Sequence, residues 1–286
     1  GRTGATRPAL SSGDARRQDR QASSPRDRTT ARTGDQVDAA DASVPSYAAP
    51  AARVATPPAA TVIAIANQKG GVGKTTTTVS LGAALAERGV RVLVADLDPQ
   101  GNASTGLDVR VADGEASMVD VIVDATSAGD AIRTTAIENL DVLPASLELA
   151  SAEVELVSAM ARERALVNGL APVRDRYQVV LVDCPPSLGL LTVNAFVAAD
   201  QLLVPVQCEY YALEGLTGLL RTIDLVERNL NPGLAIGGVA LTMFDARTRL
   251  AQNVVDDVRG YFGARAFETV IPRTVRLSEA PSFAQP

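Results

Sequence analysis

The sequence predicts an α/β fold, a doubly wound and mostly parallel sheet with helices on both faces. From residue 61 onward, apolar strand-like runs alternate with amphipathic helical runs, as in successive βα units. Residues 179–182 and 202–204 are continuous aliphatic runs, which are typical of strands covered on both faces. Polar residues suited to a phosphate site follow several of these strands, and ligands of such sheets bind beyond the carboxyl ends of the strands.

The individual elements follow from this alternation, because short apolar runs bounded by turn residues indicate strands and longer amphipathic runs indicate helices. The expected strands are residues 61–66, 91–96, 140–143, 178–183, 201–206, 235–242 and 267–271. The expected helices are residues 74–88, 115–124, 146–171, 188–198, 212–229 and 249–262. Since a helix fits between most successive strands, the strands can pair in parallel through helical crossovers.

Residues 1–60 differ in composition from the remainder of the chain. They are rich in Ala, Arg, Ser, Thr, Asp, Gly and Pro and contain almost no large aliphatic residues. Such a segment cannot bury enough apolar surface to offset its ordering entropy. We therefore expect a disordered N-terminal extension over 1–60 and one folded domain over 61–286. Weak contact of the extension with DNA or a partner, through its arginines, is the less favoured alternative to a solvated tail.

The charge distribution limits the kind of partner that the folded domain can bind. The formal net charge is −6, of which residues 1–60 contribute +3 and the remainder −9. An acidic domain argues against a DNA-binding surface that covers the whole protein, although a local arginine patch is compatible with it. Only two lysines occur in the whole chain, Lys69 and Lys74.

The composition also indicates a cytoplasmic protein. No run approaches the roughly 18 apolar residues of a membrane span, and the N-terminus lacks the apolar region of a secretory signal. The two cysteines, Cys184 and Cys208, lie far apart and without metal-ligand spacing. They are expected to be reduced thiols rather than a disulfide.

The most informative segment is Asn67–Thr76, NQKGGVGKTT, between the first expected strand and the first expected helix. Its glycines allow backbone N–H groups to converge on an anion, and the helix adds the positive end of its dipole. Lys74 is expected to reach the β- and γ-phosphates, and Thr75 to complete the shell of a Mg²⁺ ion. The usual G-x-x-x-x-G-K-[ST] pattern has glycine where this chain has Gln68, and a second lysine, Lys69, stands beside it. The segment therefore predicts a variant phosphate loop rather than an ordinary glycine-rich turn. Its expected binding residues are Lys69, Gly70, Gly71, Val72, Gly73, Lys74, Thr75 and Thr76.

Three carboxylates at strand ends complete the expected phosphate site. Asp96 and Asp98 end the second strand at i, i+2 spacing; we assign Asp96 to the metal side and Asp98 to the attacking water. Without the neighbouring phosphate loop, residues 96–99 would be better interpreted as a polar turn at the end of a strand than as a catalytic pair. Asp183 ends the aliphatic strand 179–182, as a Walker B carboxylate for Mg²⁺ does.

Three arginines, Arg247, Arg273 and Arg276, are candidates for a basic surface. Composition alone does not favour DNA contact over an ordinary solvated or salt-bridged role for them.

Taken together, these motifs resemble those of the deviant Walker ATPases of the ParA type, which partition chromosomes and plasmids. The resemblance covers about residues 61–286 and rests on segments 69–76, 96–104, 183–187, 205–215 and 271–282. It implies a P-loop NTPase fold, an ATPase activity with ATP and Mg²⁺ as cofactors, and a cytoplasmic, nucleoid-associated protein. Relatives continue beyond the position of Pro286 with a closing amphipathic helix, so the C-terminal end is expected to be truncated.

The resemblance also implies roles for individual residues. The lysine matching Lys69 crosses a dimer interface to the other subunit's ATP, and the aspartate matching Asp98 serves hydrolysis. The backbone near Pro272 and Arg273 is expected to face the adenine. The arginines matching Arg247 and Arg276 contribute to sequence-nonspecific DNA binding.

The function that this resemblance implies is an ATP-driven switch for DNA partitioning. ATP closes a homodimer, the dimer binds nonspecific DNA, and a ParB-type centromere-binding partner triggers slow hydrolysis. The main alternative is a MinD-like ATPase that regulates division-site placement at the membrane. An iron–sulfur reductase with the same loop is a third class, but Cys184 and Cys208 do not suit a bridging cluster. A binding module without hydrolysis would require Asp98 to be dispensable.

Overall fold

The computed structural model of the chain describes residues 60–124, 126–210 and 212–280. The expected disordered extension therefore lies outside the described residues, except for residue 60, and so does the C-terminal end at 281–286. All of the predicted strands and all of the predicted site residues lie inside them.

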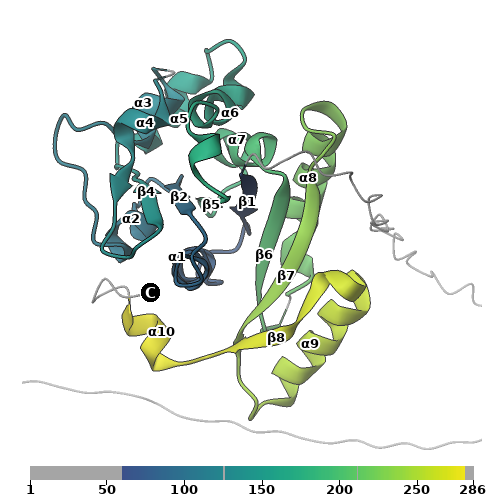
Figure 1. The fold of residues 1–286 in the computed structure, drawn as a ribbon. Helices are drawn as coiled ribbons and strands as arrows, with labels where there is room; N and C mark the ends of the chain where they lie inside the picture. Colours follow the sequence, from purple (N-terminus) through teal and green to yellow (C-terminus); the bar gives the residue numbers. More distant parts are fainter. Residues whose placement is uncertain (1–59, 125, 211, 281–286) are drawn as a thin grey trace, which may run out of the picture. The chain divides into compact units, whose positions relative to one another are not determined.

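The described residues form an eight-stranded sheet in the order β3-β4-β2-β5-β1-β6-β7-β8 (Figure 1). Every neighbouring pair is parallel except β3 and β4, which are antiparallel. The strands are β1 Thr61–Ile65, β2 Val92–Asp96, β3 Arg133–Thr134, β4 Leu140–Leu143, β5 Val179–Asp183, β6 Gln201–Gln207, β7 Ala235–Phe244 and β8 Ala266–Pro272. The predicted α/β fold with a mostly parallel sheet is confirmed.

Helices connect these strands and pack on both faces of the sheet (Figure 1). The α-helices are α1 Lys74–Ala86, α2 Asn102–Gly106, α3 Met118–Ile122, α4 Ala128–Ala131, α5 Leu149–Leu156, α6 Ala165–Leu170, α7 Leu190–Ala198, α8 Thr217–Asn229, α9 Arg249–Phe262 and α10 Val275–Glu279. Short 3₁₀ turns occupy Arg162–Arg164, Arg174–Arg176, Glu214–Leu216 and Gly263–Arg265. Among the described residues, no helix has both the length and the apolar character that a membrane crossing requires.

The two faces of the sheet bury alternate residues of the same strands, because successive side chains of a strand point in opposite directions. On β5, Val180 and Val182 pack into the core beneath helices α3 to α9, whereas Leu181 packs into the core beneath α1 and α2. On β1, Ala64 and Ile65 divide in the same way. This two-sided burial explains why the strands read as unbroken aliphatic runs.

The prediction of one long helix over 146–171 is wrong. The segment contains α5, then Ala161 with a φ of 52°, a 3₁₀ turn, and α6. The side chain of Asn194, on α7, compensates the interrupted backbone. Its amide nitrogen donates to the Arg162 carbonyl at 2.8 Å, and its Oδ1 accepts from the Leu166 N–H at 3.2 Å. This tertiary contact from Asn194 favours an interruption between α5 and α6. The local pattern of apolar residues does not reveal it.

Two other predicted helices are shorter than expected. The helix expected over 115–124 is α3, which begins after Ser117; the Ser117 hydroxyl accepts from the Val119 N–H, and Asp120 completes a capping box. The helix expected over 212–229 begins at Thr217, after a 3₁₀ turn. Four short elements were not predicted: α2, α4, β3 and α10.

Candidate functional site

The phosphate loop joins β1 to α1 at the centre of the sheet. Gly71 and Gly73 have φ values of 72° and 87°, in the left-handed region that favours glycine. A Cβ at Gly70 or Gly71 would meet no atom within 4 Å, so the missing side chains leave open space above the loop. Helix α1 begins at Lys74 without a side-chain cap, and the N–H groups of a first helical turn have no partner within their own helix. The loop is therefore an open cradle of backbone donors.

Buried side chains hold this loop in place. The amide of Asn67 donates to the Pro205 carbonyl at 2.7 Å, and its Oδ1 accepts from the Lys69 N–H at 2.9 Å. On the other side, the Thr242 hydroxyl donates to the Val72 carbonyl at 2.8 Å. The loop conformation is thus set by contacts with β6 and β7, before any ligand binds.

The structure brings Lys74, Thr75 and Asp183 together. Asp183 is fully buried at the end of β5; one carboxylate oxygen accepts from the Thr75 hydroxyl at 2.7 Å, and the other from the Thr78 hydroxyl at 2.9 Å. Lys74 is buried, with 7 % of its surface exposed, and its ammonium donates to the Lys69 carbonyl at 3.4 Å. Burial lowers the pKa of Lys74, and the nearby Asp183 carboxylate opposes that shift.

Asp96 and Asp98 lie beside this group, at the end of β2, where Asp96 is the ladder partner of Asp183. Asp96 is fully buried and accepts from both the N–H and the hydroxyl of Ser104, at 2.8 and 2.7 Å. Its other oxygen accepts from the Asp98 N–H at 3.2 Å. Asp98 is also buried and accepts from the Gln100 N–H at 3.0 Å. Asp96 thus anchors α2 and the loop that carries Asp98; its assignment to the metal side stays a prediction.

Pro272 and Arg273 lie across a cavity from the start of α1. The cavity has a volume of about 240 Å³ and reaches the phosphate loop at Gly73. Its lining residues are Gly73, Thr76, Thr77, Ser80, Thr242, Met243, Ile271, Pro272, Arg273, Thr274 and Leu277. This cavity is contiguous with the cradle, and it is where a group attached to a bound phosphate chain would fit.

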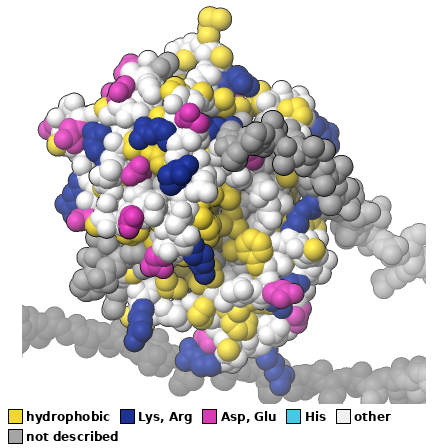
Figure 2. Space-filling view, viewed as in Figure 1, with side chains coloured by type: hydrophobic (Ala, Val, Ile, Leu, Met, Phe, Trp, Pro, Cys, Tyr) yellow, Lys and Arg dark blue, Asp and Glu magenta, His cyan; other side chains and the backbone are white. Residues whose placement is uncertain are grey.

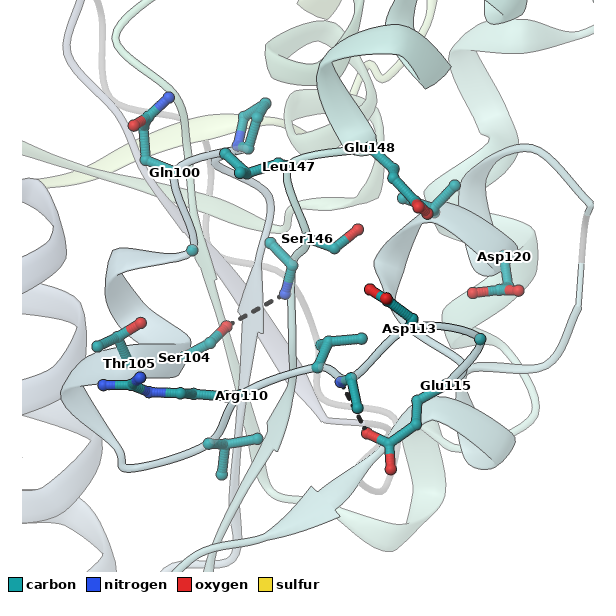
Figure 3. A pocket seen from close by; sticks show the side chains of 18 of the residues that line it. Gln100, Ser104, Thr105, Arg110, Asp113, Glu115, Asp120, Ser146, Leu147 and Glu148 are labelled. Atoms are coloured by element: carbon teal, nitrogen blue, oxygen red, sulfur yellow. Dashed lines mark hydrogen bonds between the residues drawn. The ribbon is translucent and has the colours of Figure 1, made fainter.

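A larger cavity, of about 510 Å³, is lined in part by residues 99–101, which directly follow Asp98 (Figure 3). Gln100 and Ser104 line one wall, and the Ser104 hydroxyl accepts from the Ala145 N–H at 3.1 Å. Its charged lining residues are Arg110, Asp113, Glu115, Asp120, Asp124 and Glu148. Five carboxylates against one arginine do not suit a triphosphate, so the phosphate loop is the better candidate for anion binding.

The two arginines predicted to bind DNA lie in different segments. Arg247, between β7 and α9, is exposed but engaged by Asp245 through two bonds, Nε to Oδ1 at 2.9 Å and Nη2 to Oδ2 at 2.7 Å. Those bonds hold the pKa of Asp245 at about 2. Arg276, on α10, is exposed and makes no ion pair within the described part of the chain. Of the two, Arg276 presents the more available charge.

Sequence reasoning assigned no individual role to five residues that shape the site: Asn67, Thr78, Ser104, Glu209 and Thr242. Three of them, Asn67, Ser104 and Glu209, lie within segments that it singled out. Thr78 had a usable signal, because it follows Lys74 by four residues and lies on the same face of α1. The other four depend on which loops the strand order brings together. That information is not contained in local pattern.

Burial of the acidic groups predicts a dependence of stability on pH. Burial, reinforced by the neighbouring Asp96, raises the pKa of Asp183 to about 8, and burial raises the pKa of Asp96 to about 6. Between pH 6 and 8 the folded state therefore binds more protons than the unfolded state, whose Asp pKa is about 3.9. The unfolding free energy of nucleotide-free, metal-free protein is expected to fall as the pH rises across this window, by about 1 kcal/mol per pH unit. Urea unfolding in EDTA at several pH values measures it.

Asp183→Asn is the matched variant for this pH dependence. It keeps the shape of the side chain but removes the titrating group, so its unfolding free energy should vary much less between pH 6 and 8. The same slope in the variant and in the unsubstituted protein would show that another group is responsible.

Comparison with known proteins places this geometry in a family. A family model described as an AAA domain matches residues 60–236. The chain is 56% identical to the sporulation initiation inhibitor protein Soj of Bacillus subtilis over 225 residues, which are 79% of this chain and 89% of that protein. It is 52% identical to the chromosome partitioning protein ParA of Caulobacter vibrioides, over 79% of this chain and 85% of that protein.

A solved structure agrees with the fold. The structure described as cobyrinic acid a,c-diamide synthase from Mycobacterium smegmatis, with a bound ATP analog and magnesium, is 40% identical. Its TM-score is 0.71, and the match covers 79% of this chain and 93% of that chain. With a phosphate loop that carries two lysines, a mostly parallel sheet in this order and relatives at these identities, the chain belongs to the ParA-type family of AAA-domain ATPases.

Proposed function

We propose that this protein is an ATP-hydrolysing switch that partitions chromosomal or plasmid DNA. The observation that carries the proposal is the two-lysine phosphate loop, held open beside Thr75 and Asp183, which are 2.7 Å apart. The relatives at 56% and 52% identity, the second of which is named as a chromosome partitioning protein, support the same function. The cellular setting that follows is the cytoplasm, in association with the nucleoid.

In this proposal, the residues of the loop have distinct tasks. Backbone N–H groups of residues 70–76 and the Lys74 ammonium bind the triphosphate. The cavity beside Pro272 and Arg273 takes the adenine. The Thr75 hydroxyl and the Asp183 carboxylate are hard oxygen donors, which are the ligands that Mg²⁺ takes. When bound, Mg²⁺ neutralises negative charge on the phosphates.

Hydrolysis and dimerisation depend on the two remaining predicted catalytic residues. Asp98, held by the Gln100 N–H, orients the attacking water for in-line displacement. Lys69 reaches from one subunit to the ATP of the other and adds positive charge at the transition state, so hydrolysis waits for two subunits to close. A ParB-type partner then stimulates a slow basal rate.

DNA binding by the closed homodimer reconciles an acidic protein with a nucleic-acid partner. Figure 2 shows Lys and Arg side chains interspersed with acidic ones on the face in view, rather than joined in one basic patch. Two subunits would bring twice the number of available arginines to one surface, which favours phosphate-directed contact without sequence readout.

Three alternatives have weaker support. A MinD-like regulator of division-site placement shares the loop, but the relatives at 56% and 52% identity carry the names Soj and ParA. The solved structure at 40% identity is described as a diamide synthase, yet the relatives with the higher identities carry the name Soj or ParA. An iron–sulfur reductase is disfavoured, because Cys184 and Cys208 are both buried in the hydrophobic core.

The DNA contact is tested by Arg276→Ala. The variant should bind ATP like the unsubstituted protein, while its affinity for nonspecific duplex DNA in ATP falls and its salt dependence flattens. The slope of log K against log salt is expected to change by about 2 per dimer, roughly one phosphate contact per subunit. Fluorescence anisotropy at several salt concentrations measures both quantities.

Arg247→Ala is the matched control, because the Arg247 guanidinium is already paired with Asp245. It should weaken DNA binding less than Arg276→Ala does. If Arg276→Ala keeps the full affinity and slope, the assignment of α10 to the DNA surface is wrong.

A further inference from the structure

One carboxylate joins the two ends of the candidate nucleotide site. Glu209 follows β6, and its Oε2 lies 3.5 Å from the Lys69 ammonium in the phosphate loop. Its Oε1 lies 3.0 Å from Nη2 of Arg273, at the end of β8 beside the smaller cavity. Three segments far apart in sequence therefore meet through a single side chain. Segment 205–215 contributes to the family resemblance, but the sequence assigns no role to Glu209 itself.

The backbone that carries Glu209 is firmly held. The Glu209 N–H donates to the Gln207 carbonyl at 2.8 Å, and the Gln207 side-chain amide donates to the Glu209 Oε1 at 2.5 Å. The Cys208 N–H donates to the Thr242 carbonyl at 3.0 Å and so continues the pairing of β6 with β7. The Arg273 N–H is likewise fixed, by the Phe244 carbonyl at 3.0 Å. These hydrogen bonds thus fix the position of the Glu209 carboxylate. The longer side chains of Lys69 and Arg273 can bind to it or leave it.

The contacts themselves are suited to being made and broken. The side chains of Lys69, Glu209 and Arg273 are 42%, 44% and 56% exposed. Ion pairs at this exposure contribute little to folding and are screened by salt. In the structure, the Lys69 ammonium is thus engaged by a carboxylate of its own subunit.

We propose that Glu209 is a positioning residue for Lys69: it holds the Lys69 ammonium in the nucleotide-free subunit, next to Arg273, and releases it when two subunits close. The holding contact stands on the geometry alone, whereas its release on closure rests on the proposed function. Glu209 then opposes premature closure, and nucleotide at the Arg273 side competes for one of its two cations.

Amine labelling tests the holding contact directly. The chain has two lysines, and Lys74 is buried, so it serves as an internal reference for Lys69. Full-length, nucleotide-free protein is acetylated with a limiting amine-reactive reagent and read by mass spectrometry. Glu209→Gln should raise labelling of Lys69 relative to Lys74 by roughly two- to fivefold, the range that exposed ion pairs contribute. Glu214→Gln, an exposed glutamate in the following 3₁₀ turn, should leave the ratio unchanged.

Sedimentation with saturating ATP and Mg²⁺ tests the release. Glu209→Gln should shift the monomer–dimer equilibrium toward dimer by roughly two- to fivefold, while Glu214→Gln should not. Unchanged Lys69 labelling overturns the proposal, and so does dimerisation that is unchanged or weaker in Glu209→Gln. If the unsubstituted protein stays monomeric with ATP, the proposed function fails instead; the labelling result, which needs neither nucleotide nor dimer, still decides the holding contact.

Discussion

Lys69→Ala is expected to lower ATP turnover by about 10³-fold or more while nucleotide binding is retained, because its proposed role is to supply charge across the dimer interface at the transition state. The side chain of Lys69 is partly exposed and touches Glu209, whereas the loop itself is held by Asn67 and Thr242. Removing the Lys69 ammonium therefore leaves the cradle intact. Phosphate release at saturating ATP, together with titration of a fluorescent nucleotide, measures the two effects separately.

Lys74→Ala is the control for this prediction. The Lys74 ammonium is buried within the loop, so its loss should weaken nucleotide binding itself. Turnover in Lys69→Ala close to that of the unsubstituted protein would exclude a role for Lys69 in hydrolysis. Equal loss of nucleotide binding in both variants would instead assign Lys69 to the ground-state site.

Asp98→Asn is expected to lower turnover by about 10²-fold or more, and to accumulate the ATP-bound dimer. An amide keeps the oxygen that accepts from the Gln100 N–H, so the loop after β2 should hold its shape. What is lost is the negative charge that, in the proposed function, orients the attacking water. Single-turnover hydrolysis and sedimentation with ATP measure the rate and the dimer.

Thermal unfolding provides the check on Asp98→Asn. Its midpoint should stay near that of the unsubstituted protein, because the hydrogen bond to Gln100 survives the substitution. Normal turnover would show that Asp98 is dispensable and that another group serves hydrolysis.

The sheet could be predicted from sequence because burial on both faces leaves a continuous aliphatic signature. Strand β5 and strand β6 were located to within one residue at each end for this reason. The break in the helix expected over 146–171 could not be predicted, because it depends on Asn194 from a segment that follows it in the chain. Short helices such as α2 and α10 have too few residues for a helical period to be visible.

In the candidate site, too, the residues set by local sequence could be predicted, and those set by tertiary contacts could not. Glycines and lysines of the phosphate loop were found because backbone geometry and charge require those residue types at that spacing. The Thr75–Asp183 contact was implied by the strand that ends at Asp183 and is present at 2.7 Å. Ser104 and Glu209 escaped notice because their importance arises only when α2 turns back on β2, and when β6 and β8 end near the loop.

The position of β1 between β5 and β6 has a consequence for the protein as it leaves the ribosome. The Val72 carbonyl accepts a hydrogen bond from the hydroxyl of Thr242, which lies 170 residues later in the chain. At a synthesis rate of about 5–20 residues per second, the nascent loop waits roughly 10–30 s for that support. Until β7 has emerged, the nascent loop therefore lacks this hydrogen bond to the sheet.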